Sequence, residues 1–272
     1  MFAQSAPLAL ELNMRNFIRS YTHLRNDPHS RVRDLEAIST DSKLDRAMQV
    51  VLRETEATQP STSPKITFQQ LDLGTEGIGK TTIAVYAFNT RNAAKTFRAT
   101  CDAILNCDAV WPDYSLVKSS LKVIPVPPTN HHVRYGISEH LYRQDATGEQ
   151  IFSEGRDLSY WRMTDSCGVF VWDYVDVDDL HPLRKSTAVK RNTVGAYVWV
   201  ICDRSVLVDV MADVLWVDGV ERIVCRNICS DMQVLVNLPE LALDVARFAL
   251  LGDMLLFETI KEDVTDWHDA VV

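Results

Sequence analysis

A series of short segments follows Lys65, and these segments constrain the fold more than any other feature of the sequence. Each is rich in β-branched and aromatic residues or alternates apolar with polar ones, and turn signals such as "GTEG", "DATGE" and "TDSCG" separate them. This spacing is typical of antiparallel hairpins. The segments are "KITFQQLDL", "TTIAVYAF", "HVRYGISEHLYR", "DLSYWRM", "GVFVWDYVDV", "AYVWVICD", "DVLWV" and "ERIVCRNI".

Helices are expected on both sides of these strands and between them. One is predicted over about 90–106, and a long one over about 239–263 is apolar almost all round, as in a helix covered on most sides. Upstream, residues 7–25 and 42–57 show helical spacing of apolar residues, the second with Ser42 as N-cap. The prolines and hydroxyl residues of 58–64 indicate a linker. We predict a helical segment over 1–64 and an α+β domain over 65–272.

Composition excludes several classes of protein. No apolar run reaches the roughly eighteen residues of a membrane span, and the first residues lack a basic leader followed by an apolar stretch, so a cytoplasmic protein is expected. The net charge of -9 argues against nucleic-acid binding, which needs clustered Lys and Arg. The six cysteines contain no C-x-x-C pair and are interpreted as reduced.

The stretch "GTEGIGKTT", Gly74 to Thr82, matches the phosphate-loop pattern G-x-x-x-x-G-K-[ST]. A working phosphate loop leads into a helix N-terminus, whose N–H groups hold the phosphates. The residues after Lys80 are instead β-branched and aromatic, which favours a hairpin with the glycines at its turn. The alternative is a nucleotide hydrolase that uses Lys80 and Thr81, with Asp203 on magnesium.

Other chemical signals are weak. The cluster "DYVDVDD" at 173–179 lacks the glycine and distal glutamate of a calcium loop, and it is interpreted as a strand end and turn. His131 and His132 have no partner at zinc-site spacing, and no nucleophile elbow appears. We expect no cofactor, no metal and no catalysis.

Four stretches occur in a more specific order before the apolar C-terminal segment. They are "WPDYSLVKSSLKVI" (111–124), "ISEHL" (137–141), "GRDLSYWRM" (155–163) and "VKRNTVGAYVWV" (189–200). This order resembles the StAR-related lipid-transfer (START) family, over about 66–263. The resemblance implies a helix-grip fold, in which a curved antiparallel sheet surrounds a long C-terminal helix and leaves a cavity for one apolar ligand.

The resemblance also suggests polar site residues. Arg156 and Asp157 match the start of the family's R-D-F motif, with Leu158 in place of the aromatic, and Arg162 matches an arginine inside the lipid tunnel. Glu139 matches the acidic residue that pairs with it. Independently of the family, strand alternation puts Arg156, Leu158, Tyr160 and Arg162 on one face, and a charge facing a cavity needs a partner. The alternative is an outward face, on which Arg162 forms a surface salt bridge.

The predicted function is non-catalytic binding, and by extension transfer or sensing, of a lipid or another apolar small molecule, with transient membrane contact. Apolar contacts to this ligand are expected from Leu158, Tyr160 and Trp172, and from Phe248, Leu251 and Leu255 of the C-terminal segment. Trp161, Tyr174 and Trp199 are further candidates for the cavity wall, with core packing as the alternative. A second alternative to ligand binding is an interaction module of the same fold whose core is filled by side chains.

Overall fold

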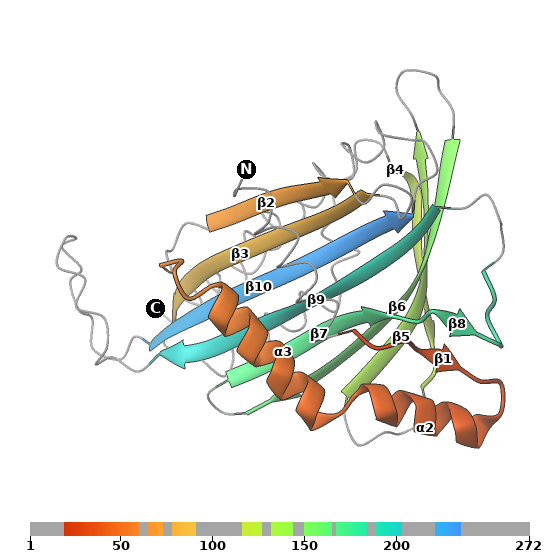
Figure 1. The fold of residues 1–272 in the computed structure, drawn as a ribbon, viewed down its shortest axis with the longest axis horizontal. Helices are drawn as coiled ribbons and strands as arrows, with labels where there is room; N and C mark the ends of the chain where they lie inside the picture. Colours follow the sequence, from red (N-terminus) through yellow and green to blue (C-terminus); the bar gives the residue numbers. More distant parts are fainter. Residues whose placement is uncertain are drawn as a thin grey trace, which may run out of the picture.

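The computed structural model describes residues 19–59, 65–72, 78–90, 116–126, 132–143, 150–164, 167–183, 189–202 and 221–234. Its main feature is an eight-stranded sheet in the order β2-β3-β10-β9-β7-β6-β5-β4 (Figure 1). The strands are β2 (Lys65–Asp72), β3 (Ile78–Thr90), β4 (Leu116–Ile124), β5 (His132–Arg143), β6 (Gln150–Met163), β7 (Cys167–Tyr174), β9 (Val189–Cys202) and β10 (Glu221–Val234).

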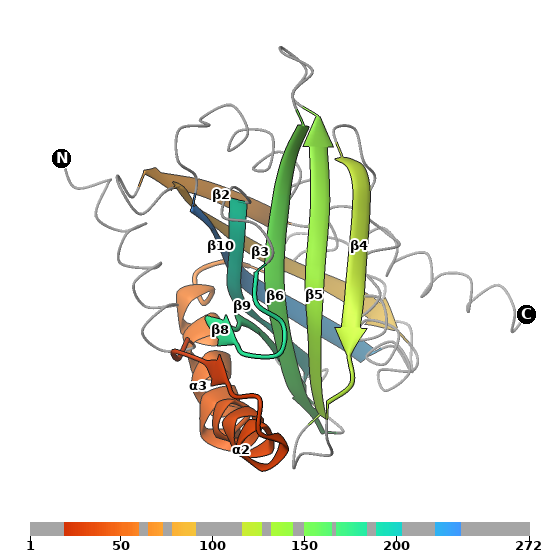
Figure 2. The same ribbon diagram turned by 90° about the vertical axis from the view of Figure 1, so that its right-hand side faces the viewer.

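Neighbouring strands of this sheet run antiparallel throughout the described order. A short parallel contact joins Ser153–Gly155 of β6 to Val189–Arg191 of β9, next to the end of the shorter strand β7. The sheet bends strongly. In Figure 2, β4, β5 and β6 stand upright in front, while β2, β3 and β10 run across behind them. The predicted antiparallel sheet is thus confirmed.

Two helices lie on one face of this sheet, α2 (Pro28–Ile38) and α3 (Asp41–Glu54). The carboxylate of Asp27 caps α2 by accepting a hydrogen bond from the N–H of Ser30, and Pro28 occupies the first turn, where its missing N–H is not needed. Thr40 caps α3, since its hydroxyl accepts from the N–H of Lys43. With both helices and the sheet, the chain is an α+β protein.

These helices correct part of the sequence-based prediction. The helix predicted over 42–57 is confirmed as α3, but its cap is Thr40 rather than Ser42. The helix α2 was not predicted. Residues 19–25, expected to end a first helix, instead contain the short strand β1 (His23–Leu24), which pairs in parallel with β8 (Val177–Asp178). The rest of that expected helix, and those over 90–106 and 239–263, lie outside the described residues, apart from Thr90 in β3.

The phosphate-loop stretch lies at a β-hairpin. Strand β2 pairs antiparallel with β3, with Asp72 opposite Ile78, so the chain reverses within the intervening residues. Lys80 and Thr81 belong to β3 and pair with residues of β10. Because no helix begins at Lys80, the N-terminal N–H groups that a phosphate loop requires are not formed there. The hairpin interpretation is confirmed, and Asp203 lies outside the described residues.

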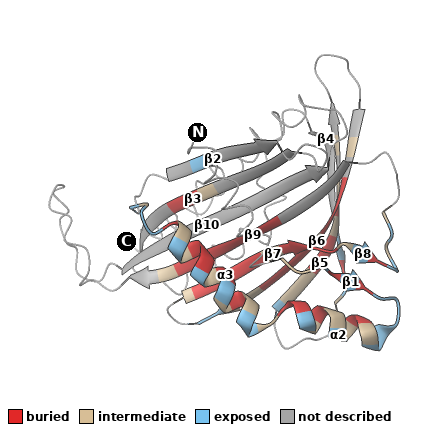
Figure 3. Cartoon of the chain, in the orientation of Figure 1, coloured by how far each residue is buried: buried red, intermediate tan, exposed pale blue. Residues whose placement is uncertain are grey.

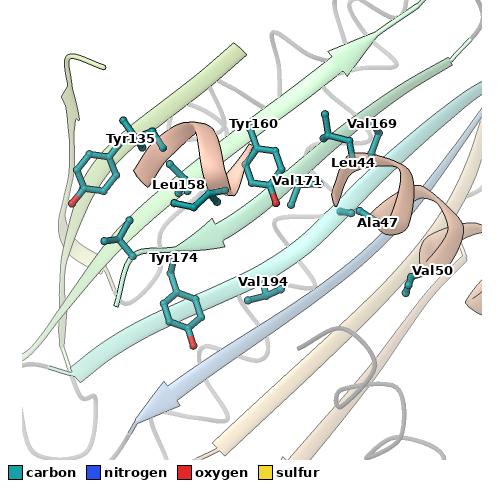
Figure 4. Close-up of a cluster of buried hydrophobic side chains, with 14 of the residues drawn as sticks. Leu44, Ala47, Val50, Tyr135, Leu158, Tyr160, Val169, Val171, Tyr174 and Val194 are labelled. Atoms are coloured by element: carbon teal, nitrogen blue, oxygen red, sulfur yellow. The ribbon is translucent and has the colours of Figure 1, made fainter. Parts of the chain in front are cut away.

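The hydrophobic core lies between the two helices and the sheet. Apolar residues of α3 recur at the spacing of one helical face and lie across β9, β7 and β10 (Figure 3). We call the sheet surface that they cover the helix face (Figure 4). Its core residues are Leu158 and Tyr160 of β6, Val169 and Val171 of β7, and Val194, Ala196 and Val198 of β9, packed with Leu35, Ile38, Leu44, Ala47, Val50 and Val51 of the helices.

Candidate functional site

A row of aromatic rings crosses the sheet on the face opposite α2 and α3. Each ring contacts the next, with centroid separations of 4.6–5.7 Å, and the contacts run continuously from β5 to β9. We call this the aromatic row and the surface that carries it the aromatic face. The row consists of His132, Trp161, Phe170, Trp172, Tyr197 and Trp199.

Strand alternation creates this row. In β7, Val169 and Val171 point to the helix face, so Phe170 and Trp172 between them point to the other. The same holds in β9, where aliphatic residues on the helix face alternate with Tyr197. The two strands pair with Phe170 opposite Tyr197, so their rings share one surface. The sequence therefore assigns aliphatic side chains to one face and aromatic ones to the other.

Exposure differs along the aromatic row. Phe170, Tyr197 and Trp199 are 1–3% exposed, whereas Trp161 and Trp172 are half-buried and His132 is exposed. The row thus has a buried end on β9 and a part on β5, β6 and β7 that retains contact with solvent.

Glycines stand between these rings on the same face. The pairing places Gly168 opposite Trp199 and Gly195 opposite Trp172, and both glycines are buried. Gly136 of β5 and Gly155 of β6 lie on the same face by alternation. A glycine inside a strand leaves its position on the sheet surface empty of side chain, so a ring or a ligand can approach the backbone closely. The aromatic face therefore has gaps in its side-chain layer at four positions.

The predicted cluster on β6 does share one face, but that face is covered by the N-terminal helices. Leu158 and Tyr160 are fully buried in the core formed with α2 and α3. The guanidinium of Arg156 donates to the backbone carbonyl of Asp176 at 2.8 Å. Ligand contact by these residues stays a prediction, and the neighbours that the structure gives them are protein groups.

Arg162 lies at the edge of the same face. Its guanidinium donates to the carboxylates of Asp41 and Asp45 in the first turns of α3, and all three side chains are partly exposed. The hydrogen bonds that Arg162 donates to Asp45 and Asp41 raise the pKa of its guanidinium. This arrangement is a surface salt bridge, the alternative that the sequence left open.

The predicted pair of Arg162 with Glu139 is wrong. Glu139 lies opposite Glu154, and Arg162 lies eight residues further along β6 (162 minus 154). At the rise of a β-strand this separation is about 26 Å, far beyond the reach of two side chains. A family motif can place two residues on neighbouring strands, but only the strand register shows whether they meet.

The acidic cluster at 173–179 binds the N-terminal segment. Its position as a strand end and turn is confirmed, since β7 ends at Tyr174 and β8 is Val177–Asp178. Asp176 accepts hydrogen bonds from Arg19 and from the N–H of Thr22, and Asp179 contacts the ring of His23 at 2.8 Å.

Asp178 is the most completely bonded of these carboxylates. Arg31 of α2 donates two hydrogen bonds to it at 2.8 and 2.9 Å, the hydroxyl of Tyr135 donates at 2.6 Å, and the N–H groups of Leu180 and His181 also donate. Burial raises the pKa of Asp178, but the hydrogen bonds from Arg31, Tyr135 and Leu180 outweigh burial and hold the pKa well below its usual range. The carboxylate thus joins α2, β5 and β8 as a structural centre.

Three further buried polar side chains belong to α3 and to the strands that lie under it. The Nζ of Lys43, the hydroxyl of Tyr160 and the Oδ2 of Asp173 are all inaccessible and have no hydrogen-bond partner within the described part of the chain. Burial raises the pKa of Asp173 to about 7, and burial lowers the pKa of Lys43. Because burial opposes the charged forms of both Asp173 and Lys43, these side chains are a source of pH dependence rather than of stability.

The remaining predicted positions divide between faces. Trp172 lies on the aromatic face, away from the Arg156–Arg162 cluster, and Tyr174 belongs to the core, with the guanidinium of Arg19 at 4.3 Å from its ring centroid. Phe170 and Tyr197 were not predicted, although the alternation within "GVFVWDY" and "AYVWV" could have identified them. Phe248, Leu251 and Leu255 lie outside the described residues.

No group of three or more His, Cys, Asp or Glu side chains among the described residues could hold a metal ion. No helix in that part of the chain is long and apolar enough to cross a membrane.

Fold and site together define a protein with a bent antiparallel sheet, N-terminal helices on one face and an aromatic row on the other. No protein-family model matches the sequence, and no curated protein matches it. Solved structures similar to this chain include START-domain proteins. Human STARD10 has 9% sequence identity and a TM-score of 0.44, with 85% of this chain and 83% of that chain covered.

Two other solved structures give similar values. Human StAR-related lipid transfer protein 5 has 11% identity and a TM-score of 0.41, covering 82% of this chain and 95% of that chain. The lipid transfer and protein localization domain of human StarD13 (DLC2) has 12% identity and a TM-score of 0.39, covering 78% of this chain and 95% of that chain.

Proposed function

We propose that this protein binds a lipid or another apolar small molecule, without catalysis, against the aromatic face of its sheet. The observation that carries the proposal is the continuous aromatic row, in which Trp161 and Trp172 remain half-buried beside buried rings. Rings of this kind offer a large apolar surface, and small-molecule sites are mostly apolar with a few placed polar groups.

The glycines of the aromatic face support the same proposal. Gly168 and Gly195 lie opposite Trp199 and Trp172, where side chains would otherwise fill the layer above the sheet. A ligand can use such positions to lie close to the backbone. The motif order along the sequence, which resembles lipid-transfer proteins, points to the same class of ligand.

We extend the proposal to the C-terminal segment, the membrane and the location of the protein, as the sequence led us to expect. The apolar segment 239–263 would form the other wall of a cavity for this ligand. The protein would be cytoplasmic and would take up its ligand during transient contact with a membrane. It would not bind nucleic acid. The rival is a filled core, in which the aromatic row serves packing alone. The low exposure of Phe170, Tyr197 and Trp199 favours this rival, so the experiment must separate the two.

Native mass spectrometry of the purified protein, followed by titration with a panel of lipids, tests the proposal. We expect a co-purified apolar ligand or saturable uptake of a lipid, and a weaker affinity in the Trp172→Ala variant. Val171→Ala is the matched control, because this neighbour lies on the helix face and its truncation lowers stability without touching the aromatic row. The filled-core rival predicts no bound ligand and no saturable uptake in any variant.

A further inference from the structure

On the aromatic face, Ser138 carries a buried hydroxyl that has no hydrogen-bond partner within the described residues. Ser138 is 5% exposed, and its Oγ has no hydrogen-bond partner within the described part of the chain. Tyr135 belongs to the core on the helix face, and Ile137 packs against it, so alternation turns Ser138 to the other face. A buried hydroxyl without a hydrogen bond is unfavourable, and such groups in native proteins call for an explanation.

Two of the positions next to Ser138 on that face are glycines, whereas Leu121 of β4 lies opposite Ser138 on its other side. Gly155 lies directly opposite on β6, and Gly136 precedes Ser138 by two residues on β5. Neither carries a side chain that could fill the position or hydrogen-bond to the hydroxyl. A group from a bound molecule could therefore reach Ser138 along the surface of the sheet.

Charges near Ser138 balance each other formally. Asp157 lies opposite Gly136, and Arg134 lies opposite Ser159, so one acidic and one basic side chain share this part of the face. Both are half-buried and both already interact with other groups. A charged ligand head would enter this buried region without a dedicated counter-charge, whereas an uncharged hydrogen-bonding head would not need one.

The strand register gives the distance from this polar position to the aromatic row. Ser138 is opposite Gly155, Ser159 is opposite Trp172, and Trp161 is opposite Phe170. On β6, Ser159 lies four positions beyond Gly155 and Trp161 lies six positions beyond it, which correspond to about 13 and 20 Å along the strand. A molecule that touches both regions must have this length, with a polar group at one end.

We propose that the ligand is an uncharged amphiphile of about 13–20 Å, whose hydroxyl or carbonyl group hydrogen-bonds to Ser138 Oγ while its apolar body lies on the aromatic row. This inference rests on the proposed function. It assigns the polar anchor to Ser138, on β5 and the aromatic face, rather than to Arg162 at the edge of the helix face.

The test compares tetradecan-1-ol with tetradecane, which differ only in the hydroxyl, in the full-length protein and in Ser138→Ala. Binding is measured by displacement of an environment-sensitive fluorescent probe. We expect the unmodified protein to prefer the alcohol and Ser138→Ala to weaken alcohol binding roughly fivefold to tenfold, the value of one hydrogen bond, with tetradecane affinity unchanged. Tetradecanoate, the charged analogue, should bind more weakly than the alcohol.

Controls keep folding and binding separate. Ser138→Ala removes an unpartnered hydroxyl, so its thermal midpoint should equal or exceed that of the unmodified protein. Ser39→Ala removes a buried hydroxyl that donates to the carbonyl of Leu35, and it should lower the midpoint without changing the preference for the alcohol.

Three results would each overturn the inference while leaving the proposed function intact. The first is equal affinity of the unmodified protein for alcohol and alkane, and the second is unchanged alcohol affinity in Ser138→Ala. The third is equal weakening of both ligands in that variant, which would count against a hydrogen bond to the head. If the unmodified protein binds neither compound nor any lipid of the panel, the proposed function itself is wrong.

Discussion

Asp173 of β7 carries a carboxylate that is buried beneath α3, and this burial creates a measurable pH dependence. Its side chain is 1% exposed, and burial raises its pKa to about 7, although the N–H of Tyr174 and the charges of Lys43 and Arg19 lower it. In the unfolded chain the carboxyl has its ordinary pKa of 3.8. Between these values the folded protein binds more protons than the unfolded chain, so the free energy of unfolding falls as the pH rises.

The size of this effect follows from the difference in pKa. Each unit corresponds to about 1.4 kcal/mol, so a rise from 3.8 to about 7 lowers the free energy of unfolding by about 4 kcal/mol. The Asp173→Asn variant cannot ionise, and its Oδ1 can still accept from the N–H of Tyr174. We expect this variant to match the unmodified protein at about pH 4 and to be more stable at about pH 8, by at most this amount.

Urea unfolding followed by tryptophan fluorescence at a series of pH values measures this difference. Lys43→Met should steepen the pH dependence, because the cation that lowers the pKa of Asp173 is lost. Glu56→Gln, at an exposed position after α3, is the control and should stay within about 0.5 kcal/mol of the unmodified protein at every pH. Parallel pH profiles for Asp173→Asn and the unmodified protein would refute the reasoning.

Two other charged positions give contrasting expectations. Asp178→Asn should destabilise the protein by about 3–5 kcal/mol in urea unfolding, because it leaves Arg31 buried without its counter-charge, and a loss under about 1 kcal/mol would contradict the account. Since the pKa of Asp178 lies below its usual range, the stability it gives is present above about pH 4 and is lost as the pH falls further. Arg162→Leu should change stability by less than about 1 kcal/mol and leave ligand uptake unchanged, as expected of a surface salt bridge; a selective loss of uptake in lipid titration would return Arg162 to the site.

The strands were predictable because their signal is local. Alternation and β-branched composition identified β5 from His132 to Arg143 with its observed limits, and they correctly favoured a hairpin over a phosphate loop around Lys80. The shorter elements were missed for the same reason. Strands β1 and β8 have two residues each, and they pair because Asp176 and Asp178 are bonded by the N-terminal segment, which is a tertiary effect.

The helix α2 could have been predicted. Asp27 followed by Pro28 is a helix start signal, and Leu35 and Ile38 lie on one helical face. The incorrect cap of α3 has a similar origin, since Thr40 and Ser42 are both capping residues and only the backbone geometry decides between them.

The site was predicted less well than the fold because alternation does not say what covers a face. It correctly placed Arg156, Leu158, Tyr160 and Arg162 together, yet the helices that cover them are α2 and α3. The pairing of Arg162 with Glu139 failed because residue spacing within two strands does not give their register. The aromatic row depends on register in the same way, since Trp172 meets Tyr197 only through the pairing of β7 with β9.

Quenching of tryptophan fluorescence by a bromine-labelled fatty alcohol tests the central claim most directly, because bromine quenches only rings that it approaches closely. Our account predicts saturable quenching in the unmodified protein. In a Trp161→Phe/Trp172→Phe variant most of this quenching should be lost, while native mass spectrometry still detects the bound alcohol, since phenylalanine keeps the face apolar. Quenching of the same extent in this variant, or no quenching at any ligand concentration in the unmodified protein, would contradict ligand binding on the aromatic face.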